Sequence, residues 1–336
     1  MRGIFLHVVG TLMGTVVSTA VMPQAAHAAE PMPLQLEAKI PLGDVKGRID
    51  HMAVDLARQR LFVAELGNDS VGIIDLGASK VASRIRGLKE PQGVGYDAST
   101  DTLYVANAGD GSVRLFHGED LKEAKRLELG DDADNVRIDS PGNRVIVGYG
   151  AGALAIIDAK ENRKVGEIAL HGNPESFRLE SGGSRIFVNV PDAHAIEVAD
   201  RESRKVVAKW RTGRSSANFP MILDEASWQV LVVFRNPALL TAYSMQDGAS
   251  AASATTCGDA DDVFVDAKRH RVYVSCGEGY LDIFERDEGS FRRTAHLLTA
   301  SGARTVLFVP ELDRLFLAVR ASAHEPAAIW VYRPDS

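Results

Sequence analysis

The feature that most constrains the fold is a repeat of about 42 residues. Short apolar segments, most of them ending in an acid, recur at steps of 41 to 44 residues. These segments are HMAVD at 51–55, GVGYD at 93–97, NVRID at 135–139, SFRLE at 176–180, PMILD at 220–224, DVFVD at 262–266 and VLFVP at 306–310. Each is followed by a polar turn and a second apolar segment, such as RLFVAE at 60–65. A period of 40–45 residues built from short strands is typical of a β-propeller blade.

Each repeat continues with a third apolar segment and a more polar fourth one, as in SVGIID at 70–75 and KVASRIRG at 80–87. The last repeat stops after its third segment, AIWVYRP at 328–334, whereas LQLEAKIPL at 34–42 precedes the first repeat. We therefore expect an all-β, seven-bladed propeller of four-stranded blades, in which the N-terminal strand completes the last blade and removes an exposed sheet edge. Residues 29–336 would form this single domain, with blades beginning near 47, 89, 131, 173, 214, 259 and 301.

Residues 1–28 have the pattern of a signal peptide. Arg2 precedes a long uncharged apolar run, and Ala26-His27-Ala28 supplies small residues for cleavage before Ala29. This predicts a periplasmic or secreted protein without stable membrane insertion. A retained membrane anchor is the alternative, although the run is short for a membrane span.

The charge balance argues against nucleic acid as a partner. The formal net charge is −7, and loss of Arg2 with the leader makes it −8. An acidic chain without a Lys/Arg cluster lacks the positive surface that binds a phosphate backbone.

Three segments carry a resemblance to a known family: RLFVAELGNDSVGIID at 60–75, LYVANAGDGSV at 103–113 and RVYVSCGEGYLDIFE at 271–285. They resemble the YVTN-type repeats of exported, seven-bladed, YncE-like propellers. The resemblance implies the fold and export, but it implies no reaction, because the repeat records blade structure.

Loops that enter the innermost strands of a propeller share one face around the central channel. Residues at these entrances are predicted to bind a ligand: Asp50, His51, Gln92, Asn135, Asn218, Asp262 and Arg304. The ends of the second strands are expected to add further polar groups, among them Glu65, Asn107, Asn189 and Arg235. Together these positions predict a polar and mostly acidic channel face.

Four acids at these entrances, Asp50, Asp134, Glu175 and Asp261, are candidate ligands for a divalent cation. Oxygen ligands from several directions suit Ca²⁺, and His51 would favour Zn²⁺. These positions are similar to the metal-ligand positions of gluconolactonase-type propellers, a family with six blades. Two alternatives remain open: solvated acids neutralised by Arg48 and Arg304, or a site for a cationic or hydroxylated organic ligand.

Two arginines, Arg137 and Arg178, occupy the same place in adjacent repeats. They either form an anion pocket between blades 3 and 4 or pair with nearby acids. His51 is a weak candidate for a catalytic base, and the sequence contains no G-x-S-x-G, H-E-x-x-H or C-x-x-C motif.

The chain has two cysteines, Cys257 and Cys276, in loop types expected to share the channel face. An even count in an exported protein predicts a disulfide, with two free buried thiols or a Cys/Asp/His metal cluster as the alternatives.

Two functions are consistent with these patterns. The first is a periplasmic module that binds a small molecule or a protein through its acidic channel face. The second is a metal-dependent, lactonase-like hydrolase in which the cation polarises a carbonyl. The sequence does not predict the oligomeric state.

Overall fold

The computed structural model describes residues 3–4, 6–7, 10, 32–287 and 289–335. The predicted signal peptide at 1–28 lies almost wholly outside these residues. The chain divides into two units, Met1–Pro31 and Met32–Ser336. Within the described ranges, no helix is long and apolar enough to cross a membrane.

The second unit contains seven antiparallel sheets of four strands each. The first strands of the sheets are β2 (Met52–Asp55), β6 (Pro91–Asp97), β10 (Val136–Asp139), β14 (Ser176–Leu179), β18 (Ser216–Asp224), β22 (Ala260–Asp266) and β26 (Thr305–Val309). The second strands are β3 (Arg60–Glu65), β7 (Thr102–Asn107), β11 (Arg144–Tyr149), β15 (Arg185–Val190), β19 (Gln229–Asn236), β23 (Arg271–Cys276) and β27 (Arg314–Val319).

The third strand of each sheet is largely buried, whereas the fourth strand is the most exposed. The third strands are β4 (Ser70–Asp75), β8 (Ser112–His117), β12 (Ala153–Asp158), β16 (Ala195–Asp200), β20 (Ala238–Ser244), β24 (Tyr280–Asp287) and β28 (Ala328–Pro334). The fourth strands are β5 (Lys80–Arg86), β9 (Lys122–Glu128), β13 (Arg163–Ala169), β17 (Lys205–Arg211), β21 (Ser250–Thr255), β25 (Ser290–Leu298) and β1 (Leu34–Pro41). Single 3₁₀ turns lie at η1 (Leu66–Asn68), η2 (Pro191–Ala193), η3 (Glu225–Ser227) and η4 (Pro310–Leu312).

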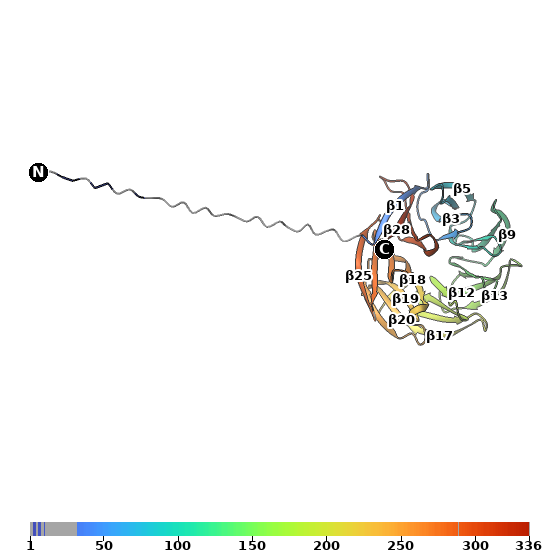
Figure 1. The fold of residues 1–336 in the computed structure, drawn as a ribbon. Helices are drawn as coiled ribbons and strands as arrows, with labels where there is room; N and C mark the ends of the chain where they lie inside the picture. Colours follow the sequence, from blue (N-terminus) through green and yellow to red (C-terminus); the bar gives the residue numbers. More distant parts are fainter. Residues whose placement is uncertain (1–2, 5, 8–9, 11–31, 288, 336) are drawn as a thin grey trace. The chain divides into compact units, whose positions relative to one another are not determined.

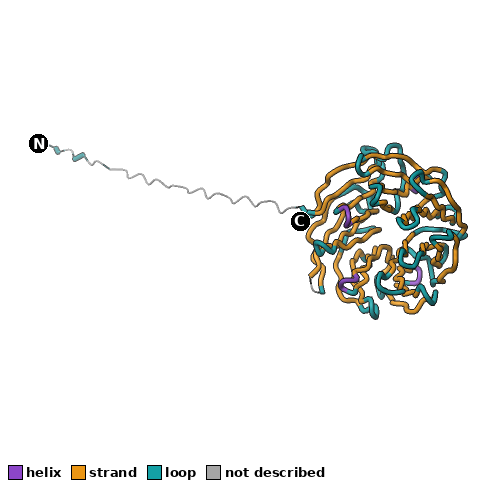
Figure 2. Tube along the Cα trace, turned by 45° about the vertical axis from the view of Figure 1, so that its right-hand side comes forward, coloured by secondary structure: helices purple, strands orange, loops and turns teal. Residues whose placement is uncertain are grey.

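The sheets are blades arranged in a closed ring, as Figure 1 shows, and loops join the strands of each blade (Figure 2). The first strand of every blade contacts the first strand of the next, and β26 contacts β2. Closure also runs through β1, which pairs with β28 from Leu34 opposite Pro334 to Pro41 opposite Ala328. The predicted seven-bladed propeller, closed by its N-terminal strand, is therefore confirmed.

The core lies between the blades. Seven apolar clusters each join two neighbouring sheets. In β3, Leu61 and Val63 belong to the cluster shared with the last blade, and Phe62 and Ala64 belong to the cluster shared with blade 2. Since successive side chains of a strand point to opposite faces, both faces are buried and the strand is apolar throughout.

The acids that end the first strands stabilise the fold. Asp139 of blade 3 lies 2.9 Å from the Arg201 guanidinium of blade 4, and both side chains are buried. Within blade 6, Asp266 accepts hydrogen bonds from Arg269 and from the Tyr273 hydroxyl. These recurring acids are therefore structural partners of arginines and hydroxyls.

Candidate ligand-binding cavity

A polar cavity of about 230 Å³ lies where the first strands begin, at one end of the channel. Its lining comes from all seven blades: Arg48, Asp50, His51, Gln92, Asp132, Asp134, Asn173, Glu175, Ser176, Phe219, Arg235, Asp261, Asp262 and Arg304. The close approach of blades 2 and 3 depends on Gly93, because a Cβ at that position would overlap the carbonyl oxygen of Asp134. Six carboxylates and three arginines meet in this space.

Most residues singled out from the sequence line this cavity: Asp50, His51, Gln92, Asp134, Glu175, Asp261, Asp262 and Arg304. Asn135 and Asn218 do not, because both side chains are buried between blades. The Asn135 amide donates to the Glu175 carbonyl at 2.7 Å. The Asn218 amide donates to Asn189 Oδ1 at 3.1 Å and to the Ala195 carbonyl at 2.9 Å. Their amide groups therefore donate hydrogen bonds within the protein and do not line the cavity.

The second-strand ends differ from the expectation. Glu65, Asn107 and Asn189 are fully buried and do not line the cavity. Glu65, for example, accepts hydrogen bonds from Arg84 and from Ser70 inside its own blade. Arg235 is the second-strand end that reaches the cavity, where its guanidinium lies 3.8 Å from the centre of the Phe219 ring.

One side of the cavity is electrically compensated. Arg48 donates to Asp50 at 2.7 Å. Arg235 lies 2.5 Å from Asp261, and Arg304 lies 3.1 Å from the same carboxylate. Asp259, just outside the cavity, contacts both of these arginines. The pairing of Arg48 and Arg304 with acids, one of the open alternatives, is therefore present on this side.

The opposite side, formed by blades 3 and 4, carries acids without basic partners. Neither Asp134 nor Glu175 has a Lys or Arg nitrogen within 4.0 Å in the described part of the chain. The nearest ring nitrogen to Asp134 Oδ1 is His51 Nε2, at 3.8 Å. Asp134 Oδ1 is buried and accepts no hydrogen bond from any described group. Asp132, nearby, accepts a hydrogen bond from the Asn173 amide at 3.0 Å.

Burial and neighbouring charges shift the pKa values of Asp134, Glu175 and His51. Burial raises the pKa of Asp134 well above its usual value, and the charges of Asp50 and Glu175 raise it further. Burial raises the pKa of Glu175 to about 7, with a further contribution from Asp261. Burial also lowers the pKa of His51 to about 3, assisted by the positive charge of Arg137. At neutral pH His51 is therefore uncharged and does not neutralise the acids beside it.

The four candidate metal ligands line the cavity but do not converge. Asp50 and Asp261 are engaged by arginines, whereas Asp134 and Glu175 are not. Among the described residues, no group of three or more His, Cys, Asp or Glu side chains is arranged to hold a metal ion. Asp134 and Glu175, with Asp132 beside them, are the groups best placed to meet a cation.

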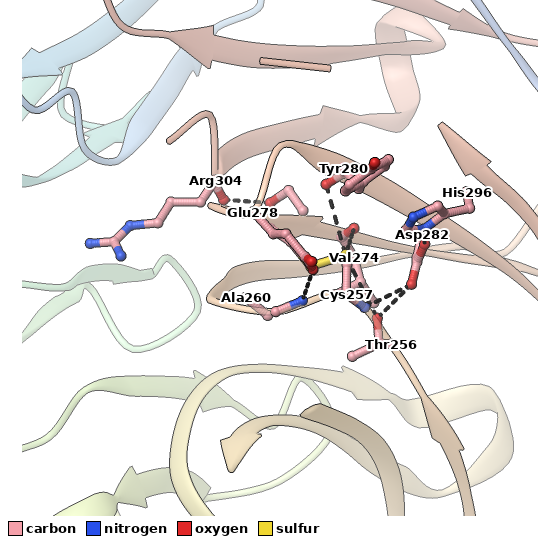
Figure 3. Close-up of a disulfide and its surroundings, with 12 residues drawn as sticks. Thr256, Cys257, Ala260, Val274, Glu278, Tyr280, Asp282, His296 and Arg304 are labelled. Atoms are coloured by element: carbon pink, nitrogen blue, oxygen red, sulfur yellow. Dashed lines mark hydrogen bonds and ion pairs between the residues drawn. A yellow bond between two sulfur atoms is a disulfide. The ribbon is translucent and has the colours of Figure 1, made fainter. Parts of the chain in front are cut away.

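The predicted disulfide between Cys257 and Cys276 is confirmed, with the two Cα atoms 5.8 Å apart (Figure 3). Both cysteines are buried in the core between blades 5 and 6. The amide of Cys257 also donates to buried Asp282 at 2.9 Å. The segment that follows Cys257 carries Asp259 and Asp261, which contact Arg235 and Arg304, so the disulfide anchors the compensated side of the cavity.

Comparisons with known proteins identify the fold. No protein-family profile and no curated protein sequence matches the chain. A chain in the crystal structure of the mitotic checkpoint complex superposes with a TM-score of 0.76 at 12% identity, covering 95% of this chain and 99% of that one. A chain of Kuenenia stuttgartiensis hydrazine synthase superposes with a TM-score of 0.70 at 17% identity, covering 90% and 99%. At such identities the likeness shows the propeller fold alone.

Proposed function

We propose that this propeller is an exported binding module whose channel cavity holds a small ligand through a positively charged group, such as a protonated amine. One observation carries the proposal: Asp134 Oδ1 is buried at the cavity, has no hydrogen-bond partner among the described residues, and shares its side of the cavity with Glu175, which also lacks a basic partner.

A cation is expected at this place because burying Asp134 and Glu175 close together is unfavourable in free energy. A carboxylate removed from water without a hydrogen bond or a counter-charge is destabilising, and neighbouring negative charges increase the cost. An ammonium group between Asp134 and Glu175 would donate several hydrogen bonds and offset the repulsion. The opposite side of the cavity needs no such group, because Asp50 and Asp261 already have arginine partners.

The cavity also offers neutral groups for the rest of a ligand. Gln92, Asn173 and Ser176 line it, and the Phe219 ring supplies an apolar surface. A polar cavity with a few directional groups and one aromatic wall suits a small polar organic molecule. A periplasmic protein that inserts a lysine side chain would present the same chemistry, and propellers commonly mediate protein interactions.

Export is supported by the buried disulfide, since such bonds persist in oxidising compartments. The N-terminal sequence pattern and the repeat resemblance to YVTN-type, YncE-like proteins point the same way. Cell fractionation of the full chain tests this part: we expect the protein in the periplasm, shortened by 28 residues. Full-length protein in the cytoplasm would contradict export.

The lactonase-like hydrolase remains an untested alternative. It requires a cation between acids, and arginines already occupy two of its four candidate ligands. His51, with a pKa lowered to about 3, is also a weak base at neutral pH. No observation favours hydrolysis over binding, so binding is the function we propose.

A thermal-unfolding screen tests the proposal. Purified protein is heated with a panel of amines, amino acids and their uncharged analogues, with CaCl₂ and ZnCl₂ as separate arms. We expect amines to raise the unfolding temperature of the wild type and of the exposed control Asp120→Asn, but not that of Asp134→Asn. Stabilisation only by a metal would favour the metal-site alternative, and equal responses of both variants would contradict the proposed site.

A further inference from the structure

Two arginines on adjacent first strands lie close together, and neither forms a salt bridge with an acid of the described chain. Arg137 belongs to β10 and Arg178 to β14. Arg137 Nε donates to the carbonyl oxygen of Phe177 at 3.1 Å, and Arg178 Nη1 donates to the same oxygen at 3.3 Å. One carbonyl oxygen therefore receives hydrogen bonds from two guanidinium groups, which brings two like charges together.

Neither guanidinium forms a salt bridge with an acid of the described chain, although the negative charge of Asp262 favours the charged form of both. Within the described chain, no Asp or Glu oxygen lies within 4.0 Å of Arg137 or Arg178, whereas most other half-buried arginines have such a partner. Arg137 donates two more hydrogen bonds, to the Val136 carbonyl and to Asn135 Oδ1, both at 2.8 Å. Arg178 donates only to Phe177. Since a guanidinium carries five N–H donors, most of those on this pair are left without a protein acceptor.

The arginine pair lies near the cavity. Asn135 links the two regions, because it accepts from Arg137 and donates to the backbone carbonyl of Glu175. The charges of Arg137 and Arg178 both lower the pKa of His51, which lines the cavity. Burial lowers the pKa of Arg178 to about 10, and burial together with the Arg178 charge lowers the pKa of Arg137. The charge of Asp262 opposes both shifts, and that of Asp134 opposes the shift of Arg137. Arg178 therefore remains charged at neutral pH.

We propose that Arg137 and Arg178 form an anion subsite of the channel, which takes a carboxylate or phosphate group of the ligand. Paired guanidinium groups with free donors match the oxygens of such groups in geometry and in charge. This inference rests on the proposed function for the other end of the ligand, where Asp134 and Glu175 would hold a cation. The ligand class is then a small zwitterion that carries an amine and an anionic oxygen group.

The subsite is tested with defined probes at constant ionic strength. Sodium acetate and sodium phosphate probe the anion alone, and 4-aminobutyrate and phosphoethanolamine probe both groups. Affinities are measured by calorimetry on the wild type, on Arg178→Gln and on Arg214→Gln, an exposed control. Arg178 is the better target for substitution, because it gives one hydrogen bond to the protein whereas Arg137 gives three.

We expect saturable binding of at least one anion by the wild type and by Arg214→Gln, and a loss of about tenfold or more in Arg178→Gln, as expected for removal of hydrogen bonds to a charged group. Stronger binding of phosphate or of acetate identifies the anionic group. The proposal is overturned if the wild type shows no saturable anion binding, or if Arg178→Gln binds as the wild type does.

The Asp134→Asn variant separates this proposal from the proposed function. If the variant keeps anion binding and loses the amine response, both are supported. Anion binding by the wild type without any amine response would contradict the cation site and leave the anion subsite standing. Amine binding that is insensitive to Arg178→Gln, with no anion binding, would overturn the subsite alone.

Discussion

Oδ1 of Asp134 lies 3.8 Å from Nε2 of His51, and no described group donates a hydrogen bond to it. His51 is uncharged at neutral pH because burial lowers its pKa to about 3. The residue beside Asp134 in the channel therefore does not supply the positive charge that the carboxylate lacks. This relationship separates the acidic side of the cavity from the side where arginines compensate the acids.

The pH dependence of stability should reveal the crowded acids. Because the pKa of Glu175 is raised to about 7 from its ordinary value of 4.5, the folded state binds this proton more tightly than the unfolded state. Its stabilising contribution is complete below pH 4.5 and is lost as the pH rises towards 7. We expect Glu175→Gln to be more stable than the wild type at pH 8 and equally stable at pH 4.5 in urea denaturation. The exposed control Glu119→Gln should match the wild type at both pH values, and a Glu175→Gln effect of equal size at both would be inconsistent with the shifted pKa.

Breaking the buried ion pair between Asp139 of blade 3 and Arg201 of blade 4 should strongly destabilise the protein. Arg201→Ala leaves the buried carboxylate of Asp139 without its partner, which should lower the free energy of unfolding by about 3–5 kcal/mol. Arg163→Ala breaks an exposed pair with Glu161 and should cost less than about 1 kcal/mol. Similar losses in the two variants would show that the buried pair does not join the blades.

Closure of the ring depends on apolar side chains of β1. Ile40 is 2% exposed and packs between the last blade and the first, whereas Leu36 on the same strand is 46% exposed. Ile40→Ala should lower the free energy of unfolding by about 2–5 kcal/mol. Leu36→Ala should change it by less than about 0.5 kcal/mol. Chemical denaturation monitored by fluorescence measures both, and an Ile40→Ala variant as stable as Leu36→Ala would contradict closure by this strand.

The disulfide should stabilise the fold through loop closure. It joins residues 19 positions apart, so replacing both cysteines by alanine should lower the free energy of unfolding by about 3 kcal/mol. The same variant should also bind ligand more weakly, because the segment that holds Asp259 and Asp261 loses its anchor. Denaturation and calorimetry are the measurements, and unchanged values in both would show that hydrogen bonds such as Cys257 N to Asp282 suffice.

The periodicity of the sequence determined much of the fold, because each repeat is one blade and each blade buries both faces of its central strands. The same periodicity located the starts of the first strands, and so placed Asp50, Asp134, Glu175 and Asp261 at one cavity. The periodicity did not predict which basic side chains pair with these acids. Arg235 reaches the cavity from β19, which has eight residues where β3 has six.

The repeat pattern also did not predict the direction in which individual side chains point. Asn135 and Asn218 occupy the predicted positions in sequence, yet they turn between blades to satisfy buried backbone carbonyls. In β18 the pairing register shifts between Asn218 and Met221, an irregularity that a repeat pattern does not encode. Such local geometry decides whether an acid at the cavity has an arginine partner. The proposed cation site depends on this difference, because Asp134 and Glu175 lack such a partner.

The most direct test of the cation site is a calorimetric titration with a matched pair of compounds, namely the amine that stabilises the protein most in the screen and the analogue in which a hydroxyl replaces its ammonium group. Our account predicts one binding site, an affinity for the amine at least about tenfold higher than for the hydroxyl analogue, a difference of about 1.4 kcal/mol, and loss of this preference in Asp134→Asn. Equal affinities for the two compounds, or a preference that survives in Asp134→Asn, would contradict it.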